Sequence, residues 1–285
     1  MKEITIISGK GGTGKTSIAA SIAVLADKHV ITDCDVDAAN LHLLLDPTLE
    51  TKNNFWGMPR VEVDAAKCTA CGLCEELCNY GAIKSGKVDE LLCEGCLVCY
   101  HACPEGAVRM VENLAGHWFT CSTKFGPFVH ARLGIAQDNS GKLVAEVRKQ
   151  ARMLAEREGK ELIITDGPPG IGCPVIASLG GTDLALVVVE PSLSSMHDLS
   201  RVLDLTKHFG VKTAVCINKW DINPENTRQV EEMCREVNVP VMGRVSYDPA
   251  VIAAAMKGKP VIQMVSTVVD DIIALWHCMQ EELGI

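Results

Sequence analysis

Eight of the fourteen cysteines in this 285-residue chain lie between positions 68 and 103, in two runs of identical spacing. Each run reads C-x₂-C-x₂-C-x₃-C. Cysteines this dense are usually either a disulfide framework, which implies secretion, or metal ligands. Met1 leads almost directly into an apolar stretch, so we expect no signal peptide. The clustered cysteines are therefore better interpreted as metal ligands.

The two runs repeat with an offset of 25 residues, which aligns Cys68 with Cys93 and Cys78 with Cys103. Their spacing resembles that of bacterial two-cluster ferredoxins, in which the fourth cysteine of each run binds the other cluster. Three thiolates within seven residues surround one cluster, and the helix that follows carries the fourth away. The expected ligand sets of two 4Fe–4S clusters are Cys68, Cys71, Cys74 with Cys103, and Cys93, Cys96, Cys99 with Cys78.

Two zinc sites are the alternative interpretation of these cysteines. Zinc ribbons usually pair two separated C-x₂-C knuckles, which is a different spacing. One detail departs from the ferredoxin pattern, because Pro104 follows the last cysteine of the second run whereas Asn79 follows Cys78. We expect this to change local rigidity or potential and to leave the cluster in place.

A second candidate site lies near the N-terminus, where residues 9–16 fit the pattern G-x-x-x-x-G-K-[ST]. Glycines let successive backbone N–H groups turn toward phosphate oxygens, and the following helix points its positive end at them. Lys15 would reach the outer phosphates, and the Thr16 hydroxyl would hold Mg²⁺. The residues expected to contact a nucleotide are Gly9, Gly11, Gly12, Thr13, Gly14, Lys15, Thr16 and Ser17.

Polar residues at the ends of three further apolar stretches could complete this site. Asp33, Asp35 and Asp37 follow one stretch, and Asp166 is delivered by another into a Gly/Pro loop, where it could hold a metal-bound water. Asn218, in "INKWD", could pair with a purine edge, or the segment could be an ordinary turn at a strand end.

Alternating strands and helices are predicted to position these residues. This alternation predicts an α/β fold with a doubly wound, mostly parallel sheet covered on both faces. Ligands of such sheets bind at the carboxyl ends of the strands, where these charged residues and glycines lie. The predicted strands are 3–8, 29–37, 160–170, 182–192, 211–221 and 239–248, and the predicted helices are 16–28, 140–158, 194–208, 225–237 and 270–283.

The cysteine runs interrupt this alternation. We therefore predict a nucleotide-binding domain in two segments, 1–59 and 112–285, with a small α+β ferredoxin-like domain inserted at 60–111. Residues 116–134, between the insert and the long helix, are interpreted as a hairpin.

The segment "KGGTGKT" resembles the deviant Walker motif of the MinD, ParA and Mrp ATPases and of the nitrogenase iron protein. The resemblance implies that Lys10 reaches the partner's phosphates in a nucleotide-sandwich homodimer. It makes Asp35 a first-switch residue near the attacking water, and it places Asp166 in the second switch. Residues 190–192 and 247–261 look like later landmarks of the family. Without the resemblance, Lys10 would be an ordinary solvated loop lysine.

Composition disfavours other functions of this superfamily. The formal net charge of −9 argues against a general nucleic-acid surface, and no run is long enough to span a bilayer. A membrane-docking helix at the C-terminus is disfavoured, because residues 270–285 have no basic face. We recognise no glutaminase domain in the 285 residues that would support a role like that of the amidotransferase-like relatives.

The two sites together resemble MinD-superfamily ATPases that carry an inserted ferredoxin domain. This resemblance implies a cytoplasmic ATPase, weak without its partner, that binds ATP, Mg²⁺ and two 4Fe–4S clusters. Dimer-dependent ATP turnover would be coupled to electron transfer to a redox partner. A metallocluster assembly or carrier protein is the alternative, and oxygen-sensitive clusters indicate an anaerobe.

Cys173 raises a further question about the dimer. In the nitrogenase iron protein, a switch-region cysteine helps to hold a cluster that bridges the two subunits. The resemblance allows the same role for Cys173, with Cys121 as a partner ligand, but a buried structural cysteine is the alternative. The other scattered cysteines are interpreted as core residues.

Overall fold

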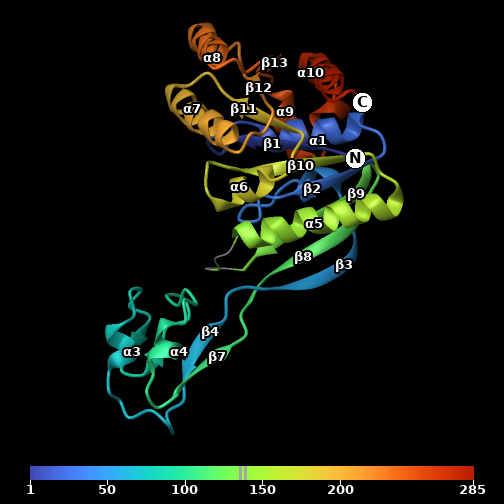
Figure 1. The fold of residues 1–285 in the computed structure, drawn as a ribbon. Helices are drawn as coiled ribbons and strands as arrows, with labels where there is room; N and C mark the ends of the chain where they lie inside the picture. The colour runs from blue at the N-terminus through green and yellow to red at the C-terminus, as the bar shows by residue number, and fades with distance from the viewer. Residues whose placement is uncertain (135–136, 138–139) are drawn as a thin grey trace. The chain divides into compact units, whose positions relative to one another are not determined.

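The computed structural model describes residues 1–134, 137 and 140–285, and these residues form two compact units. Unit 1 comprises residues 1–52, 118–131 and 141–285, and unit 2 comprises residues 53–117 and 132–140. Figure 1 shows the course of the chain through both units. The predicted insert boundaries, 60 and 111, both fall inside unit 2.

A nine-stranded sheet carries unit 1, in the order β13-β12-β11-β1-β10-β2-β9-β8-β3. Every pairing from β13 to β9 in this order is parallel, as the alternation predicts. The strands of this sheet are β1 (Lys2–Ser8), β2 (His29–Asp33), β3 (Thr48–Trp56), β8 (Leu114–Thr123), β9 (Gly126–Leu133), β10 (Leu162–Pro169), β11 (Leu184–Val189), β12 (Thr213–Asn218) and β13 (Val241–Val245).

Helices cover both faces of the sheet, because alternate side chains of a strand point to opposite faces. Ile4 and Ile6 of β1 pack into a core with α1, α9 and α10, whereas Ile7 packs into a second core with α6, α7 and α8. The helices of unit 1 are α1 (Lys15–Leu25), α2 (His42–Leu45), α5 (Ser140–Glu158), α6 (Cys173–Leu179), α7 (Leu193–His208), α8 (Pro224–Glu236), α9 (Ala250–Met256), η1 (Val261–Gln263) and α10 (Thr267–Leu283).

Some elements follow the predictions closely and others were missed. The long helix α5 spans 140–158 as predicted, and the predicted hairpin is the pair β8 and β9. Strand β3 was missed because its sequence, TLETKNNFW, is polar and almost entirely exposed at the edge of the sheet. It therefore lacks the apolar alternation from which a strand is inferred.

Unit 2 repeats the offset of 25 residues in three dimensions. Val63 pairs with Val108 in one small antiparallel sheet, and their repeat equivalents Val88 and Ile83 pair in the other. The two short helices, which begin at Leu73 and Val98, are also repeat equivalents, and they lie side by side (Figure 1). The elements of unit 2 are β4 (Arg60–Val63), α3 (Leu73–Glu76), β5 (Ile83–Lys84), β6 (Lys87–Val88), α4 (Val98–Ala102) and β7 (Val108–Val111).

None of the helices in the described ranges is both long and apolar enough to cross a membrane.

Candidate functional site

The glycine loop lies between β1 and α1 and makes a tight turn. Gly12 and Gly14 have φ angles of 81° and 95°, which side chains with a Cβ rarely adopt. A Cβ at Gly14 would lie 2.2 Å from the amide nitrogen of Asn218, and one at Gly9 would lie 2.4 Å from the Cβ of Asp198 in α7. The loop therefore packs against two neighbouring elements, and Lys15 at the start of α1 is buried.

Two buried carboxyl groups lie under this loop on neighbouring strands. Asp33 in β2 and Asp166 in β10 are directly paired in the sheet. Neither carboxylate oxygen of Asp166 has a hydrogen-bond partner among the described residues, although the side chain is 1% exposed. Burial raises the pKa of Asp166 to about 7, against the lowering effects of Lys15 and the nearby Thr16 hydroxyl. Burial and the Asp166 charge also raise the pKa of Asp33.

Asp33 organises the loop that carries Asp35. Its carboxylate accepts hydrogen bonds from the backbone N–H groups of Asp35, at 3.0 Å, and Leu41, at 3.1 Å. Partial burial raises the pKa of Asp35, and the charge of Lys15 opposes this effect. The sequence predicted Asp33 only as one of several acidic residues. It did not indicate that the Asp33 carboxylate accepts hydrogen bonds from both ends of this loop.

The strand ends enclose a cavity of about 530 Å³ beside the glycine loop. Its walls come from the loop, from the segment after β2 and from the end of β10, so the structure brings these sequence-distant segments together. Its lining includes Gly11, Gly12, Gly14, Lys15, Thr16, Ser17, Asp35 and Asp37. Asp166 is not part of this lining but is buried near Lys15 and Thr16, and its carboxylate, which has no hydrogen-bond partner among the described residues, suits a hydrated cation held at Thr16.

A second cavity, of about 230 Å³, shares Gly12, Gly14 and Ser17 with the first. It is lined mainly by apolar side chains of the C-terminal segment and by Asn218. The amide nitrogen of Asn218 donates a 2.7 Å hydrogen bond to the Thr13 carbonyl. Asn218 therefore also braces the glycine loop, a role that neither sequence interpretation included.

Lys10 is held within its own chain in this structure. Its Nζ atom forms a 2.7 Å ion pair with Glu190 and donates hydrogen bonds to the hydroxyls of Ser192 and Ser194, at 3.3 and 3.1 Å. Glu190 also pairs with Lys219, at 3.1 Å. Two lysines at the glycine loop therefore share one carboxylate. Partial burial acts to raise the pKa of Glu190, but the contacts with Lys10 and Lys219 outweigh it, so the pKa is lowered.

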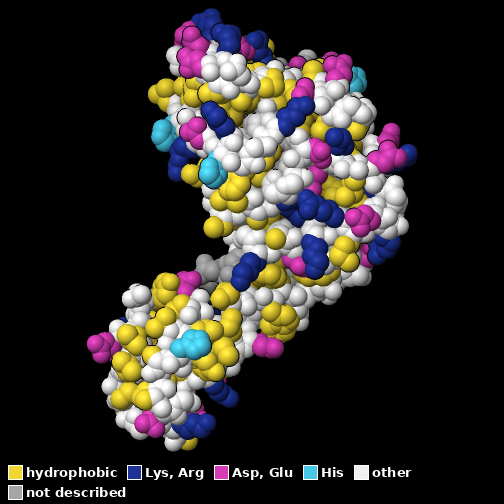
Figure 2. All heavy atoms as spheres, viewed as in Figure 1, with side chains coloured by type: hydrophobic (Ala, Val, Ile, Leu, Met, Phe, Trp, Pro, Cys, Tyr) yellow, Lys and Arg dark blue, Asp and Glu magenta, His cyan; other side chains and the backbone are white. Residues whose placement is uncertain are grey.

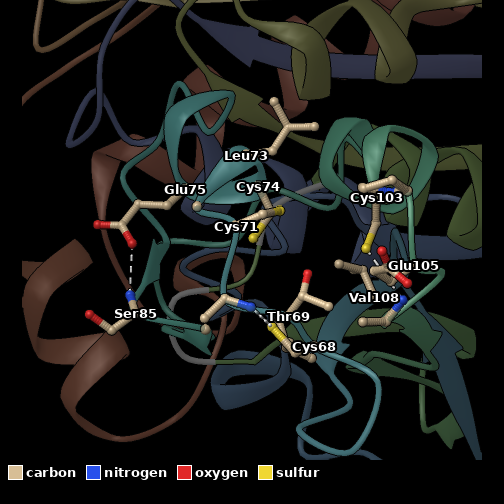
Figure 3. Close-up of a pocket in the computed structure, with 16 residues that line it drawn as sticks. Cys68, Thr69, Cys71, Leu73, Cys74, Glu75, Ser85, Cys103, Glu105 and Val108 are labelled. Atoms are coloured by element: carbon tan, nitrogen blue, oxygen red, sulfur yellow. Dashed lines mark hydrogen bonds between the residues drawn. The ribbon is translucent and has the colours of Figure 1, made fainter.

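In unit 2, four cysteines from the two runs surround one cavity of about 300 Å³. Cys68, Cys71 and Cys74 come from the first run and Cys103 comes from the second. Figure 3 shows their sulfur atoms arranged around the same space. The fold thus brings together the mixed set of cysteines that the spacing predicts for the first cluster.

Backbone N–H groups donate hydrogen bonds to cysteine sulfur atoms of both runs. Ala107 donates to Cys103, at 3.3 Å, and its repeat equivalent Ala82 donates to Cys78, also at 3.3 Å. Hydrogen bonds from Ala107 and neighbouring amides lower the pKa of the Cys103 thiol. These contacts favour thiolates, the form that binds metal.

The three cysteines at the start of the second run lie close together. Cys93 and Cys96 lie close enough to Cys99 for their charges to raise the pKa of its thiol, although burial is the larger cause. Cys78, Cys93 and Cys99 all belong to the small core of unit 2. Among the described residues, no group of three or more His, Cys, Asp and Glu side chains could hold a single metal ion.

Cys173 and Cys121 lie in different surroundings. Cys173 is exposed at the first residue of α6, whereas Cys121 is 2% exposed within the main core of unit 1. This arrangement gives no support to a shared ligand set. The interpretation of Cys173 as a buried structural cysteine is wrong, because its side chain is exposed.

Comparison with known proteins matches residues 4–261 to the family described as the CobQ/CobB/MinD/ParA nucleotide binding domain. An uncharacterised protein of Methanocaldococcus jannaschii is 37% identical over 227 residues, which are 79% of this chain and 80% of that protein. An uncharacterised ATP-binding protein of the same organism is 27% identical over 265 residues, 92% of this chain and 80% of that protein.

Solved structures share the fold of the chain. The septum site-determining protein MinD of Pyrococcus horikoshii, complexed with Mg-ADP, superposes with a TM-score of 0.61 at 21% identity, covering 99% of this chain and 97% of that one. MinD in a MinC:MinD cell division complex of Aquifex aeolicus gives a TM-score of 0.59 at 20% identity, covering 99% and 96%. The chain therefore belongs to the CobQ/CobB/MinD/ParA nucleotide-binding family of P-loop ATPases.

Proposed function

We propose that this ATPase is an iron–sulfur protein in which dimer-dependent ATP turnover is coupled to electron transfer through two 4Fe–4S clusters to a partner protein. One observation carries the proposal: cysteines from both runs line a single cavity in unit 2. A chance clustering of reduced thiols has no reason to draw three cysteines from one run and the fourth from the other. When bound, each cluster supplies a one-electron redox centre.

The cysteine geometry favours clusters over the zinc alternative. Tetrahedral zinc binds thiolates at about 2.3 Å and therefore draws four sulfur atoms tightly together. The described cysteines form no group that could hold a single ion, yet four of them line an open space of about 300 Å³. A multi-iron cluster needs such a space between its ligands. Backbone donors to Cys68, Cys78 and Cys103 would stabilise the thiolate charge.

The residues of unit 1 divide the work of ATP binding and hydrolysis. The turn at Gly12 and Gly14 would direct N–H groups at the phosphates, and Lys15 would pair with their outer oxygens. The Thr16 hydroxyl would hold Mg²⁺, which when bound neutralises developing phosphate charge. Asp166 would accept hydrogen bonds beside Thr16, and Asp35 would orient the attacking water.

Lys10 would act only in the dimer. Its ion pair with Glu190 holds this cation against a carboxylate of its own chain. A lysine delivered across a nucleotide sandwich would stabilise transition-state charge, as an arginine finger does. The chain would then hydrolyse ATP slowly as a monomer, and dimerisation would control the rate.

The surface of unit 2 suits a protein partner. Leu77, Tyr80, Leu91, Leu92 and Val98 are large apolar side chains that are exposed around the cysteine runs. Hydrophobic side chains gather on this unit in the space-filling view (Figure 2). Exposed apolar groups of this kind mark protein interaction sites, and a partner that binds here would lie near the cysteine sites.

The proposal is tested by metal analysis of protein purified without oxygen. The wild type is expected to contain iron and acid-labile sulfide for two clusters, about eight irons per chain, with 4Fe–4S signals in EPR after reduction. The variant C103S should lose the cluster of the first run, and C68S/C103S should lose no more iron than C68S alone. C278S, on the exposed side of α10, is the matched control and should retain all iron. Zinc without sulfide, or iron lost independently from Cys68 and Cys103, would contradict the proposal.

A second candidate is a metallocluster carrier or assembly ATPase. It is favoured by the exposure of Cys71 and Cys96, which are repeat equivalents and leave one ligand of each set open to solvent. A carrier should transfer iron and sulfide to an apoprotein acceptor when ATP is hydrolysed. An electron carrier should retain its clusters through many turnovers, so iron retention during ATP turnover separates the two functions.

A further inference from the structure

The internal repeat of unit 2 allows its two cysteine sites to be compared position by position. The backbone around them is closely matched: Gly81 donates to the Cys78 carbonyl and Gly106 to the Cys103 carbonyl, both at 3.2 Å. The donors to the fourth sulfur of each set are matched as well, at 3.3 Å. Differences between the two sites therefore lie mainly in the side chains.

The side chains at equivalent positions differ in charge. Glu75 and Glu105 line the cavity of the first site, which comprises Cys68, Cys71, Cys74 and Cys103. An offset of 25 residues places Tyr100 at the position of Glu75 and Tyr80 at that of Glu105. At these two positions the first site has carboxylates where the second site, which comprises Cys78, Cys93, Cys96 and Cys99, has phenols. Thr69, which also lines the first cavity, corresponds to Glu94, so the first site keeps an excess of one carboxylate.

The Glu75 carboxylate is fixed in place. It accepts a 2.7 Å hydrogen bond from the backbone N–H of Ser85, at the turn between β5 and β6 (Figure 3). Among the described residues, no lysine, arginine or histidine lines this cavity, although Lys84 and Lys87 flank the turn. The first site is therefore bordered by negative charge that no lining cation neutralises.

Net charge, hydrogen bonds to sulfur and solvent exposure set the potential of an iron–sulfur cluster. Reduction adds an electron, and neighbouring carboxylates oppose it. Two weaker differences act the other way: Ala70 donates to Cys68, at 3.4 Å, and Cys74 is less buried than its equivalent Cys99. A single amide dipole and a small difference in exposure are weaker than an excess of one full charge at the cavity wall.

We propose that Glu75 and Glu105 hold the cluster of the first site at a lower potential than that of the second. This inference rests on the proposed function. Within one chain, an electron would then leave the first cluster, which is oxidised, and enter the second, which is reduced. The charges of Glu75 and Glu105, which are not part of the cysteine pattern, would thereby set the direction of electron transfer.

Potentiometric titration followed by EPR tests this inference on the full chain. The variant E75Q/E105Q removes both charges. The amide oxygen introduced at position 75 can still accept the hydrogen bond from the backbone N–H of Ser85. The lower of the two midpoint potentials should rise, with about a tenfold change in the ratio of reduced to oxidised cluster, or about 59 mV for one electron. The higher potential should move much less.

Variants at the equivalent positions provide matched controls. Y80F/Y100F adds no charge at the second site and should leave both potentials near their wild-type values. Y80E/Y100E should lower the higher potential toward the other. A rise confined to the higher potential in E75Q/E105Q, or no change in either, would overturn the inference. A protein that contains no cluster would instead contradict the proposed function itself.

Discussion

Gly14 offers a sharp test of how the nucleotide site is built, through the variant G14A. Its φ angle of 95° is unfavourable for alanine by about 1–2 kcal/mol. The new Cβ would also lie 2.2 Å from the amide nitrogen of Asn218, which must move and give up its bond to the Thr13 carbonyl. An unsatisfied buried carbonyl costs about 1–3 kcal/mol more.

The two contributions together come to about 2–5 kcal/mol. The cost appears as a loss of folding stability, as a loss of nucleotide affinity, or as both, because the loop conformation contributes to each. Denaturant unfolding and calorimetric titration of Mg-ATP measure the two losses separately, and their sum is the predicted quantity. If affinity bore the whole cost, binding would weaken by roughly 30-fold to 4,000-fold.

The matched control is G159A, which introduces the same kind of strain away from the site. Gly159 follows α5 with a φ of 62°, and a Cβ there would have no neighbour within 4 Å. It should lower stability by about 1 kcal/mol and leave nucleotide affinity unchanged. A summed loss below about 1 kcal/mol for G14A would refute the assigned packing of Asn218 against the loop.

Three further predictions concern charged groups in unit 1. Glu3 is 4% exposed and pairs with both Arg148 and Arg152. The variant E3Q should lower the free energy of unfolding in urea by about 3 kcal/mol or more, because it leaves buried charge unpaired. The control E161Q, at an exposed ion pair, should have no measurable effect. Because burial raises the pKa of Asp166 from 3.8 to about 7, its contribution to the free energy of unfolding should fall as pH rises from about 4 to about 7. Unfolding of wild type and D166N across that window measures this difference, which a pH-independent gap would contradict. K10A should retain ATP binding and lose turnover, whereas K15A should lose binding; equal loss of binding in both would argue against a role for Lys10 confined to the dimer.

The sheet of unit 1 was predictable because its strands are short apolar runs buried on both faces. These runs end in glycines and carboxylates. Because ligands of parallel sheets bind at the carboxyl ends of the strands, the sequence predicts a ligand site there. Strand β3 could not be found in this way, since an exposed edge strand has no apolar face to give a pattern. Helix α9 was likewise hidden within a segment interpreted only as a landmark of the family.

The roles of individual side chains were less predictable than their presence at the site. Glu190 was quoted as part of a landmark, but its pairing with both Lys10 and Lys219 depends on three segments that meet only in the fold. The same holds for Asn218, whose contact with Thr13 spans 205 residues of sequence. The cysteine spacing was more informative, because seven residues leave little freedom in how three thiolates can be arranged.

The central proposal is that ATP binding in unit 1 is energetically coupled to cluster reduction at the cysteine sites. The midpoint potentials of the clusters test it most directly. These would be measured by EPR-monitored titration of anaerobic protein, with and without a non-hydrolysable ATP analogue and Mg²⁺. The account predicts a shift of at least about 59 mV in one cluster, equivalent to about 1.4 kcal/mol of coupling for one electron. Unchanged potentials in protein shown to be saturated with nucleotide would contradict ATP-gated electron transfer.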